Sequence, residues 1–182
     1  VRKPSDTIEG LTKISRAISS ELYLEDILKL IVTVTAEVMN SRICSLMLLD
    51  EKNEHLVIRA TQSISEEYIR KNPLKRGEGI AWKAVLEKKP IIILDVIKEP
   101  EYKYKDIAQK EGLVSLLCVP LTVKGRVTGV LNSYTSTPHK FTQTEINVLT
   151  SVANQAAIAI ENTELIVKTK VIQEELETRK VV

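Results

Sequence analysis

The sequence predicts an α+β domain with an antiparallel sheet and helical segments at both ends of the chain. Apolar residues recur every three or four positions across residues 6–39 and again after residue 142, which is typical of amphipathic helices. Between these segments, short apolar or alternating runs are separated by polar turns, which is typical of strands joined as hairpins. This segregation of helices and strands along the chain is the pattern of an α+β fold.

The composition fits one domain with a short extension. The chain has 182 residues, against about 150 for an average domain. It is 43% hydrophobic but only 4% aromatic, so its core is mainly aliphatic. The net charge of +2 argues against direct binding of nucleic acid or an anionic membrane, and no apolar run is long enough to span a membrane. Since no signal-peptide pattern follows the first residues, we expect a soluble, cytoplasmic protein.

The first helical region divides in two. Its first stripe runs from Ile8 through Leu11, Ile14 and Ile18 to Leu22, and a second stripe runs through residues 24–38. Polar residues at positions 19–21 separate the two, so we expect two helices with a break there.

The strands follow in pairs. A hairpin is predicted for Ile43–Leu49 and His55–Thr61, and a second for Ser115–Val123 and Val127–Thr135, joined by a two-residue turn at Lys124-Gly125. A short strand is predicted for Ile91–Leu94. The segments between the strands contain short helices that begin at Ser65, cover Ile80–Leu86 and lie near residues 106–110.

The last helix is long. Thr142 and Glu145 have the spacing of a capping box, which places the helix start there. The apolar stripe that follows is wider than one packing partner needs, and it continues weakly to Leu176. A helix of about 35 residues would be about 50 Å long, so its end would project from the domain. Since a projecting amphipathic helix usually finds a partner helix, we expect a homodimer with coiled-coil character.

Several motifs, in this order, resemble those of a GAF domain. They are Gly77-Glu78-Gly79-Ile80-Ala81, Pro90 to Val96, Glu111 to Leu121, Gly129-Val130-Leu131, His139 to Thr142, and Gln155 to Asn162. On this resemblance we assign residues 6–165 to a GAF domain and residues 166–182 to a projecting helix or linker toward an output domain that the chain does not include.

The resemblance implies more about architecture and function. It implies a sheet of five or six strands, with the terminal helices on one face and short helices and loops over the other, where they enclose a small-molecule pocket. GAF domains are mostly sensory modules and not enzymes. Residues 171–182 also resemble the entry into an ANTAR domain, which would make the output RNA-binding and the protein a transcription antitermination regulator.

From the resemblance and the alternation of residues along the strands, we predict which residues line the pocket. These are Met47, Trp82, Tyr102, Tyr104, Ile107, Leu116 and Cys118. Trp82 takes a position at which the family has a small residue, so its indole either lines the pocket or fills it. For the dimer interface we nominate Leu11, Ile14, Ile18, Leu149, Val152, Ala156 and Ile160.

Other site chemistries find less support. His55 and His139 have no second ligand at helical spacing, which disfavours haem or a metal. Cys44 and Cys118 form no CxxC motif, lie in apolar strands, and have no adjacent His, which disfavours catalysis and bilin attachment. Phe141 matches part of the cyclic-nucleotide signature of the family, but Ile146 stands where its final acid should be, so that ligand is disfavoured too.

Two functions remain. In the first, a small molecule of unknown identity binds in the pocket and the terminal helices pass the signal to an output domain. In the second, the domain is a dimerisation scaffold whose pocket is filled by Trp82 and aliphatic side chains. An enzymatic role is not expected, because no Ser/His/Asp or Cys/His group can be placed together.

Overall fold

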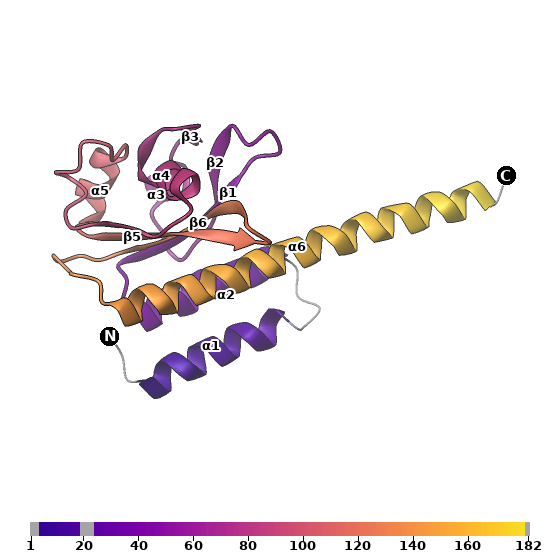
Figure 1. Cartoon of the computed structure of the whole chain (residues 1–182), viewed down its shortest axis with the longest axis horizontal. Coiled ribbons are helices and arrows are strands. Elements are labelled where there is room, and N and C mark those ends of the chain that lie inside the picture. The colour runs from indigo at the N-terminus through magenta and orange to yellow at the C-terminus, as the bar shows by residue number, and fades with distance from the viewer. Residues whose placement is uncertain (1–3, 19–23, 181–182) are drawn as a thin grey trace.

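The computed structural model describes residues 4–18 and 24–180, and it confirms the α+β fold (Figure 1). The helices are α1 (Pro4–Ile18), α2 (Leu24–Met39), α3 (Glu66–Ile69), α4 (Gly79–Glu87), α5 (Lys105–Glu111) and α6 (Gln143–Lys180). The strands are β1 (Ile43–Leu49), β2 (His55–Thr61), β3 (Leu74–Lys75), β4 (Ile91–Ile93), β5 (Leu116–Val123) and β6 (Arg126–Tyr134).

The six strands form one antiparallel sheet in the order β3-β2-β1-β6-β5-β4. The chain thus starts at the centre of the sheet with β1, builds one side, and returns through β4 and β5 to place β6 beside β1. The predicted turn between β5 and β6 is present, and Lys124 and Gly125 both have positive φ, 50° and 75°. Such a pair matches the twist of the strands it joins.

The sheet separates two cores. Along β5, Leu117, Val119 and Leu121 point toward α2 and α6, whereas Leu116 and Cys118 point toward α4 and the loops. Figure 1 shows the consequence: α2 and α6 lie side by side against one face, and α3, α4 and α5 cover the other. The layer assignment that the family resemblance implied is therefore correct.

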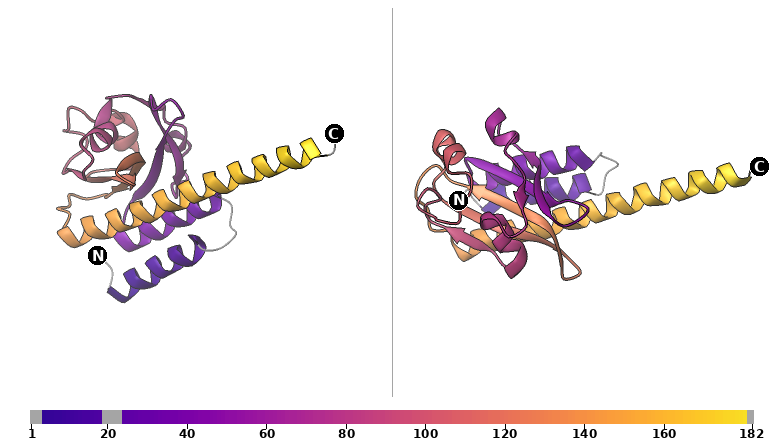
Figure 2. Two further views of the ribbon diagram at one scale, coloured as in Figure 1. Left: turned by 45° about the vertical axis from the view of Figure 1, so that its right-hand side comes forward. Right: turned by 90° about the horizontal axis from the view of Figure 1, so that it is seen from above.

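The first helix forms an outer layer. In Figures 1 and 2, α1 lies on the side of α2 and α6 that faces away from the sheet. Gly10 permits this close packing, because a Cβ added there would lie 2.8 Å from the Val38 side chain and 3.0 Å from that of Val34. The predicted break near residues 19–21 lies outside the described residues.

The long helix begins at the predicted capping box. The Glu145 backbone N–H donates to the Thr142 hydroxyl (3.2 Å), and the Thr142 backbone N–H donates to the Glu145 carboxylate (2.7 Å). The helix has 38 residues, and its C-terminal part extends beyond the domain (Figure 2). No described helix is both long and apolar enough to cross a membrane.

The wide apolar face of α6 is covered within the chain itself, by the sheet on one side and by α1 and α2 on the other. Of the residues nominated for a dimer interface, five are buried in this core and Leu11 packs against its edge. The buried five are Ile14, Leu149, Val152, Ala156 and Ile160. The Ile18 side chain lies outside the described part. The stripe that suggested a partner helix thus has its partners in the same chain.

Differences from the predicted elements are small. β3 was not predicted, since two residues carry no recognisable alternation. β4 ends at Ile93, one residue earlier than predicted, and Leu94 is exposed.

Candidate functional site

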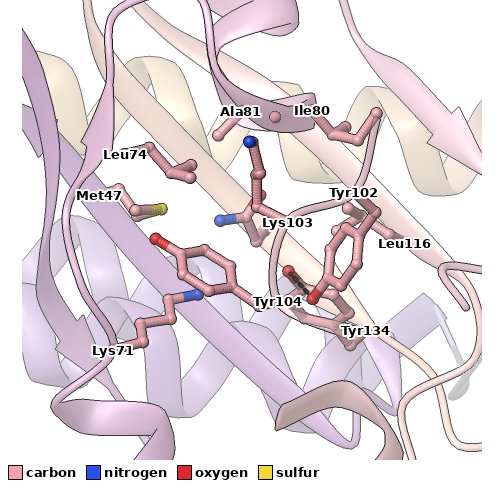
Figure 3. Close-up of a pocket in the computed structure, with 12 residues that line it drawn as sticks. Met47, Lys71, Leu74, Ile80, Ala81, Tyr102, Lys103, Tyr104, Leu116 and Tyr134 are labelled. Atoms are coloured by element: carbon pink, nitrogen blue, oxygen red, sulfur yellow. Dashed lines mark hydrogen bonds between the residues drawn. The ribbon is translucent and has the colours of Figure 1, made fainter. Parts of the chain in front are cut away.

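A small cavity lies between the sheet and its cover of α4 and the loop before α5 (Figure 3). Its volume is about 10 Å³, which is room for about one water molecule. It is lined by Met47, Lys71, Leu74, Gly79, Ile80, Ala81, Tyr102, Lys103, Tyr104, Leu116, Asn132 and Tyr134. The cavity is therefore closed to a metabolite in this conformation.

The structure brings four of the seven nominated pocket residues to this cavity. They are Met47, Tyr102, Tyr104 and Leu116. Trp82, Ile107 and Cys118 belong to the same core but do not line the cavity. Ile107 packs at the edge of that core, and the Cys118 thiol is fully buried in it.

Trp82 is held by the scaffold. It is 1% exposed, and its indole N–H donates to the carbonyl of Leu74 at 2.9 Å. This bond ties α4 to the short strand β3. The indole is thus not part of the cavity wall. The side chains of Tyr104, Lys71 and Met47 line the cavity instead (Figure 3).

Tyrosines form the polar part of the cavity wall. Tyr102 donates its hydroxyl hydrogen to the hydroxyl of Tyr134 at 3.2 Å, as Figure 3 shows. Asn132, which also lines the cavity, donates from Nδ2 to the Ser45 hydroxyl at 3.4 Å. That hydroxyl is hydrogen-bonded to the Tyr68 hydroxyl at 2.8 Å, and neither Ser45 nor Tyr68 lines the cavity itself. Burial raises the pKa of Tyr102 to about 12 and holds the pKa values of the other buried phenols well above normal, so these groups stay neutral donors.

In the described part of the chain, Lys71 is the one buried basic side chain, with 9% exposure. Its Nζ lies 4.2 Å from the ring centroid of Tyr68 and 4.6 Å from that of Tyr104. It forms no ion pair with any described acidic residue. Burial lowers the pKa of this lysine to about 7, because the charged form has lost its water.

Tyr104 covers Lys71. Its ring lies over the ammonium, and its hydroxyl donates to the backbone carbonyl of Asn72. The same ring meets Tyr102 edge to face, with centroids 6.4 Å apart. Tyr104 is half-buried and belongs to the loop before α5, so it lines the cavity and also reaches solvent.

A wider surface depression adjoins the cavity. It has a volume of about 730 Å³ and is formed by the Gly77-Glu78-Gly79 turn, α4 and the loop at Pro100 to Lys103. Gly79 and Lys103 line both spaces, so they mark the boundary between the depression and the cavity. Charged side chains of both signs line the depression, including the Lys83–Glu101 ion pair at 3.1 Å.

The cavity contains residues that the sequence reasoning did not nominate. Asn132 lines the cavity, and Ser45 does not line it but accepts a hydrogen bond from Asn132. Both are polar residues within apolar strands, and that contrast was an available signal for the polar wall. Lys71 offered none, because it stands among other charged residues and becomes buried only when the loop carrying Tyr104 returns over it.

The cysteines and histidines lie elsewhere. Cys44 faces the helix-side core, and burial raises the pKa of both thiols, that of Cys118 to about 12. His55 bonds the Asp50 carboxylate at 2.9 Å, and His139 bonds the Glu145 carboxylate at 3.0 Å. The described residues contain no group of three side chains arranged to hold a metal ion.

A sheet with the terminal helices on one face and a small covered cavity on the other defines the class of this protein as an α+β domain with one helical layer and one cavity side. The family model of the GAF domain matches residues 21–161. The chain belongs to this family.

Individual proteins agree with this assignment. The chain is 26% identical over 166 residues to a methyl sulfide methyltransferase-associated sensor of Methanosarcina acetivorans; the match covers 88% of the chain but only 17% of that sensor. The GAF domain of a phosphoenolpyruvate-protein phosphotransferase from Coxiella burnetii superposes with a TM-score of 0.80 at 25% identity, over 90% of this chain and 98% of that one.

A third similar structure is an enzyme. Free methionine-R-sulfoxide reductase from Neisseria meningitidis, in complex with its substrate, has a TM-score of 0.76 at 20% identity, covering 91% of this chain and 96% of that one. At this identity the likeness shows the shared fold alone.

Proposed function

We propose that this GAF domain is a regulatory sensor, which binds a small molecule in the cavity and signals through its terminal helices to an output domain. The observation that carries the proposal is the polarity of the cavity wall. A lysine, an asparagine and several tyrosine hydroxyls converge there inside an otherwise apolar core. The tyrosine and asparagine groups are hydrogen-bonded within the chain, whereas Lys71 has no hydrogen-bond or ion-pair partner among the described residues. A buried polar group without a partner destabilises a fold, so this wall fits a site that a ligand completes.

Binding requires the cover to move. The cavity admits about one water molecule as it stands, so a metabolite can enter only when lining side chains move, and we propose that Tyr104 is the one that swings outward. A hydrogen bond to the Asn72 carbonyl, the edge contact with Tyr102 and the contact with the Lys71 ammonium hold this ring in place. The open form is thus a minor state that a ligand would select and populate.

The central strands connect the cavity to the helices. On β1, Met47 faces the cavity while its neighbours Leu46 and Leu48 face the core under α2 and α6. On β6, Asn132 faces the cavity and Leu131 faces the helices. A ligand that shifts these strands would therefore change how the helices pack on them, and α6 would carry that change toward the output.

For the homodimer we propose a seam that begins at Ile158 of α6 and continues along its projecting part. Ile158, Leu165 and Ile172 are spaced by seven residues, and Leu176 follows by four. All four are about half exposed, at 49%, 53%, 56% and 52%. With Asn162 and Thr169 they occupy the alternating three- and four-residue positions of a coiled-coil heptad. An RNA-binding output after this helix remains part of the proposal.

The closed cavity favours a second candidate, a dimerisation scaffold that binds no ligand. In that case the side chains around Lys71 serve only to fill the core. A catalytic role has less support, because burial holds both thiols protonated.

The two methionines allow a direct test. Met47 lines the cavity and is 2% exposed, whereas Met39 is 6% exposed in the helix-side core. In a metabolite screen of the ¹³C-methyl-labelled chain, a sensor ligand should shift the Met47 resonance and raise the melting temperature. If ligand binding also changes how the helices pack, the Met39 resonance should shift as well. A scaffold would leave both resonances unchanged with every compound.

A further inference from the structure

The charge on Lys71 is unbalanced within its site. Its Nζ contacts two aromatic faces, and it has neither an ion-pair partner nor a hydrogen-bond acceptor among the described residues. Contact with aromatic rings stabilises a desolvated cation by less than the free energy that an ammonium loses when it leaves water. The rings of Tyr68 and Tyr104 therefore compensate only part of that cost.

The remaining wall of the cavity indicates what would complete it. Asn132 and the Tyr102–Tyr134 pair supply further polar groups to the same lining, and Figure 3 shows Lys71, Tyr104, Tyr102 and Tyr134 around the cavity. The apolar side chains of Met47, Leu74, Ile80 and Leu116 complete the lining. A ligand with one negative charge and a short apolar body matches a lining that is polar in one part and apolar in the rest.

We propose that the cavity binds a small carboxylate, whose negative charge pairs with the ammonium of Lys71 once Tyr104 has moved aside. The proposal rests on the sensor function above and specifies the chemical class of its ligand. A carboxylate accepts both charge-assisted and neutral hydrogen bonds, so it would use the ammonium together with the phenol and amide donors. Its short body would lie against Met47.

The test compares two molecules of nearly equal size that differ in charge. Propionate and propionamide are titrated into the methyl-labelled chain at constant ionic strength, with sodium chloride as the balancing salt, and inorganic phosphate is a third probe. We expect propionate to shift the Met47 resonance with saturation, propionamide to bind at least about tenfold more weakly, and phosphate to leave the resonance unchanged for lack of an apolar body.

Two variants identify the responsible charge. Lys71→Met keeps the length of the side chain and removes the ammonium, whereas Lys75→Met makes the same change at an exposed position of β3. We expect Lys71→Met to lose the preference for propionate and Lys75→Met to retain it. The comparison of the two probes on the unaltered chain remains decisive if Lys71→Met does not fold.

The proposal is overturned if propionate and propionamide bind equally, if phosphate alone binds, or if neither organic probe moves Met47. Equal binding would leave the sensor function standing with a neutral ligand. The absence of any response would refute the carboxylate, and the metabolite screen would then decide separately whether the cavity binds a ligand at all.

Discussion

The ammonium of Lys71 lies over the ring of Tyr68, with Nζ 4.2 Å from the ring centroid. The hydroxyl of the same tyrosine is hydrogen-bonded to Ser45 of β1 at 2.8 Å, so the buried cation is connected through one side chain to the central strand. Since the opposite face of β1 packs against the helices, a change in the charge or position of Lys71 has a short path to them.

The first prediction concerns the pH dependence of stability. The pKa of Lys71 is lowered to about 7, so between about pH 7 and 10 the unfolded chain binds more protons than the folded one. Stability from this group should therefore rise with pH across that window, by up to about 1.4 kcal/mol per pH unit. Urea unfolding of the unaltered chain and of Lys71→Met, each measured across the window, gives the difference in slope.

The comparison also removes the contribution of neighbouring groups. Tyr68, Tyr104 and Cys118 face Lys71, and burial raises their pKa values, which makes stability fall with rising pH. They are present in both proteins, so their contribution largely cancels in the difference. Identical slopes for the two proteins would mean that Lys71 is not desolvated.

The second prediction concerns the cover of the cavity. Tyr104→Phe keeps the ring over Lys71 but removes the hydrogen bond to the Asn72 carbonyl. We expect the closed form to lose about 0.5–1.5 kcal/mol and the apparent affinity for a cavity ligand to rise by up to about tenfold, because less closed form has to be displaced. Methyl titrations of Met47 measure this affinity.

Tyr102→Phe is the matched control. It also removes one phenol hydroxyl, but from the buried bond to Tyr134 and not from the cover. This variant should lose stability without any gain in affinity. An equal gain in both variants would contradict a specific role for Tyr104 as the cover.

The third prediction concerns Trp82. Its indole is fully packed and donates to the Leu74 carbonyl at 2.9 Å. Trp82→Phe should destabilise the fold by about 1–3 kcal/mol, because the carbonyl loses its donor and the core loses volume. Denaturation followed by circular dichroism measures this. Since Trp82 does not line the cavity, ligand affinity at full folding should be unchanged; a large gain would mean that the indole closes the site.

Much of the fold follows from local signals in the sequence. The bounds of β1 and β2, the Lys124-Gly125 turn and the Thr142–Glu145 capping box were predicted correctly, because each depends on residues close together in the chain. The structure also gathers five aromatic side chains on one side of the sheet. Tyr68, Trp82, Tyr102 and Tyr134 are all buried in the core on the cavity side, and Tyr104 packs against it.

The site was less predictable, because it depends on contacts between distant segments. Lys71 is buried by Tyr104, which lies 33 positions later in the chain, and no pattern near either residue indicates this contact. The apolar stripe of α6 likewise did not distinguish a second copy from the chain's own α1 and α2 as its packing partner.

The last prediction tests whether α6 also packs against a second copy of the chain. If the projecting part of α6 forms a coiled coil, Ile172→Asp places a charge in the apolar seam and should convert a dimer to a monomer. Val171→Asp makes the same change on the adjacent residue, which is 48% exposed and lies about 100° around the helix, outside the seam.

Sedimentation of the whole chain should therefore find dimers for the unaltered protein and for Val171→Asp, and monomers for Ile172→Asp. Because neither position packs against the domain, all three proteins should melt with the same core stability once the contribution of dimerisation is subtracted. A monomeric unaltered chain, or equal effects of the two substitutions, would refute the seam and leave α6 as a helix that serves only the core of its own domain.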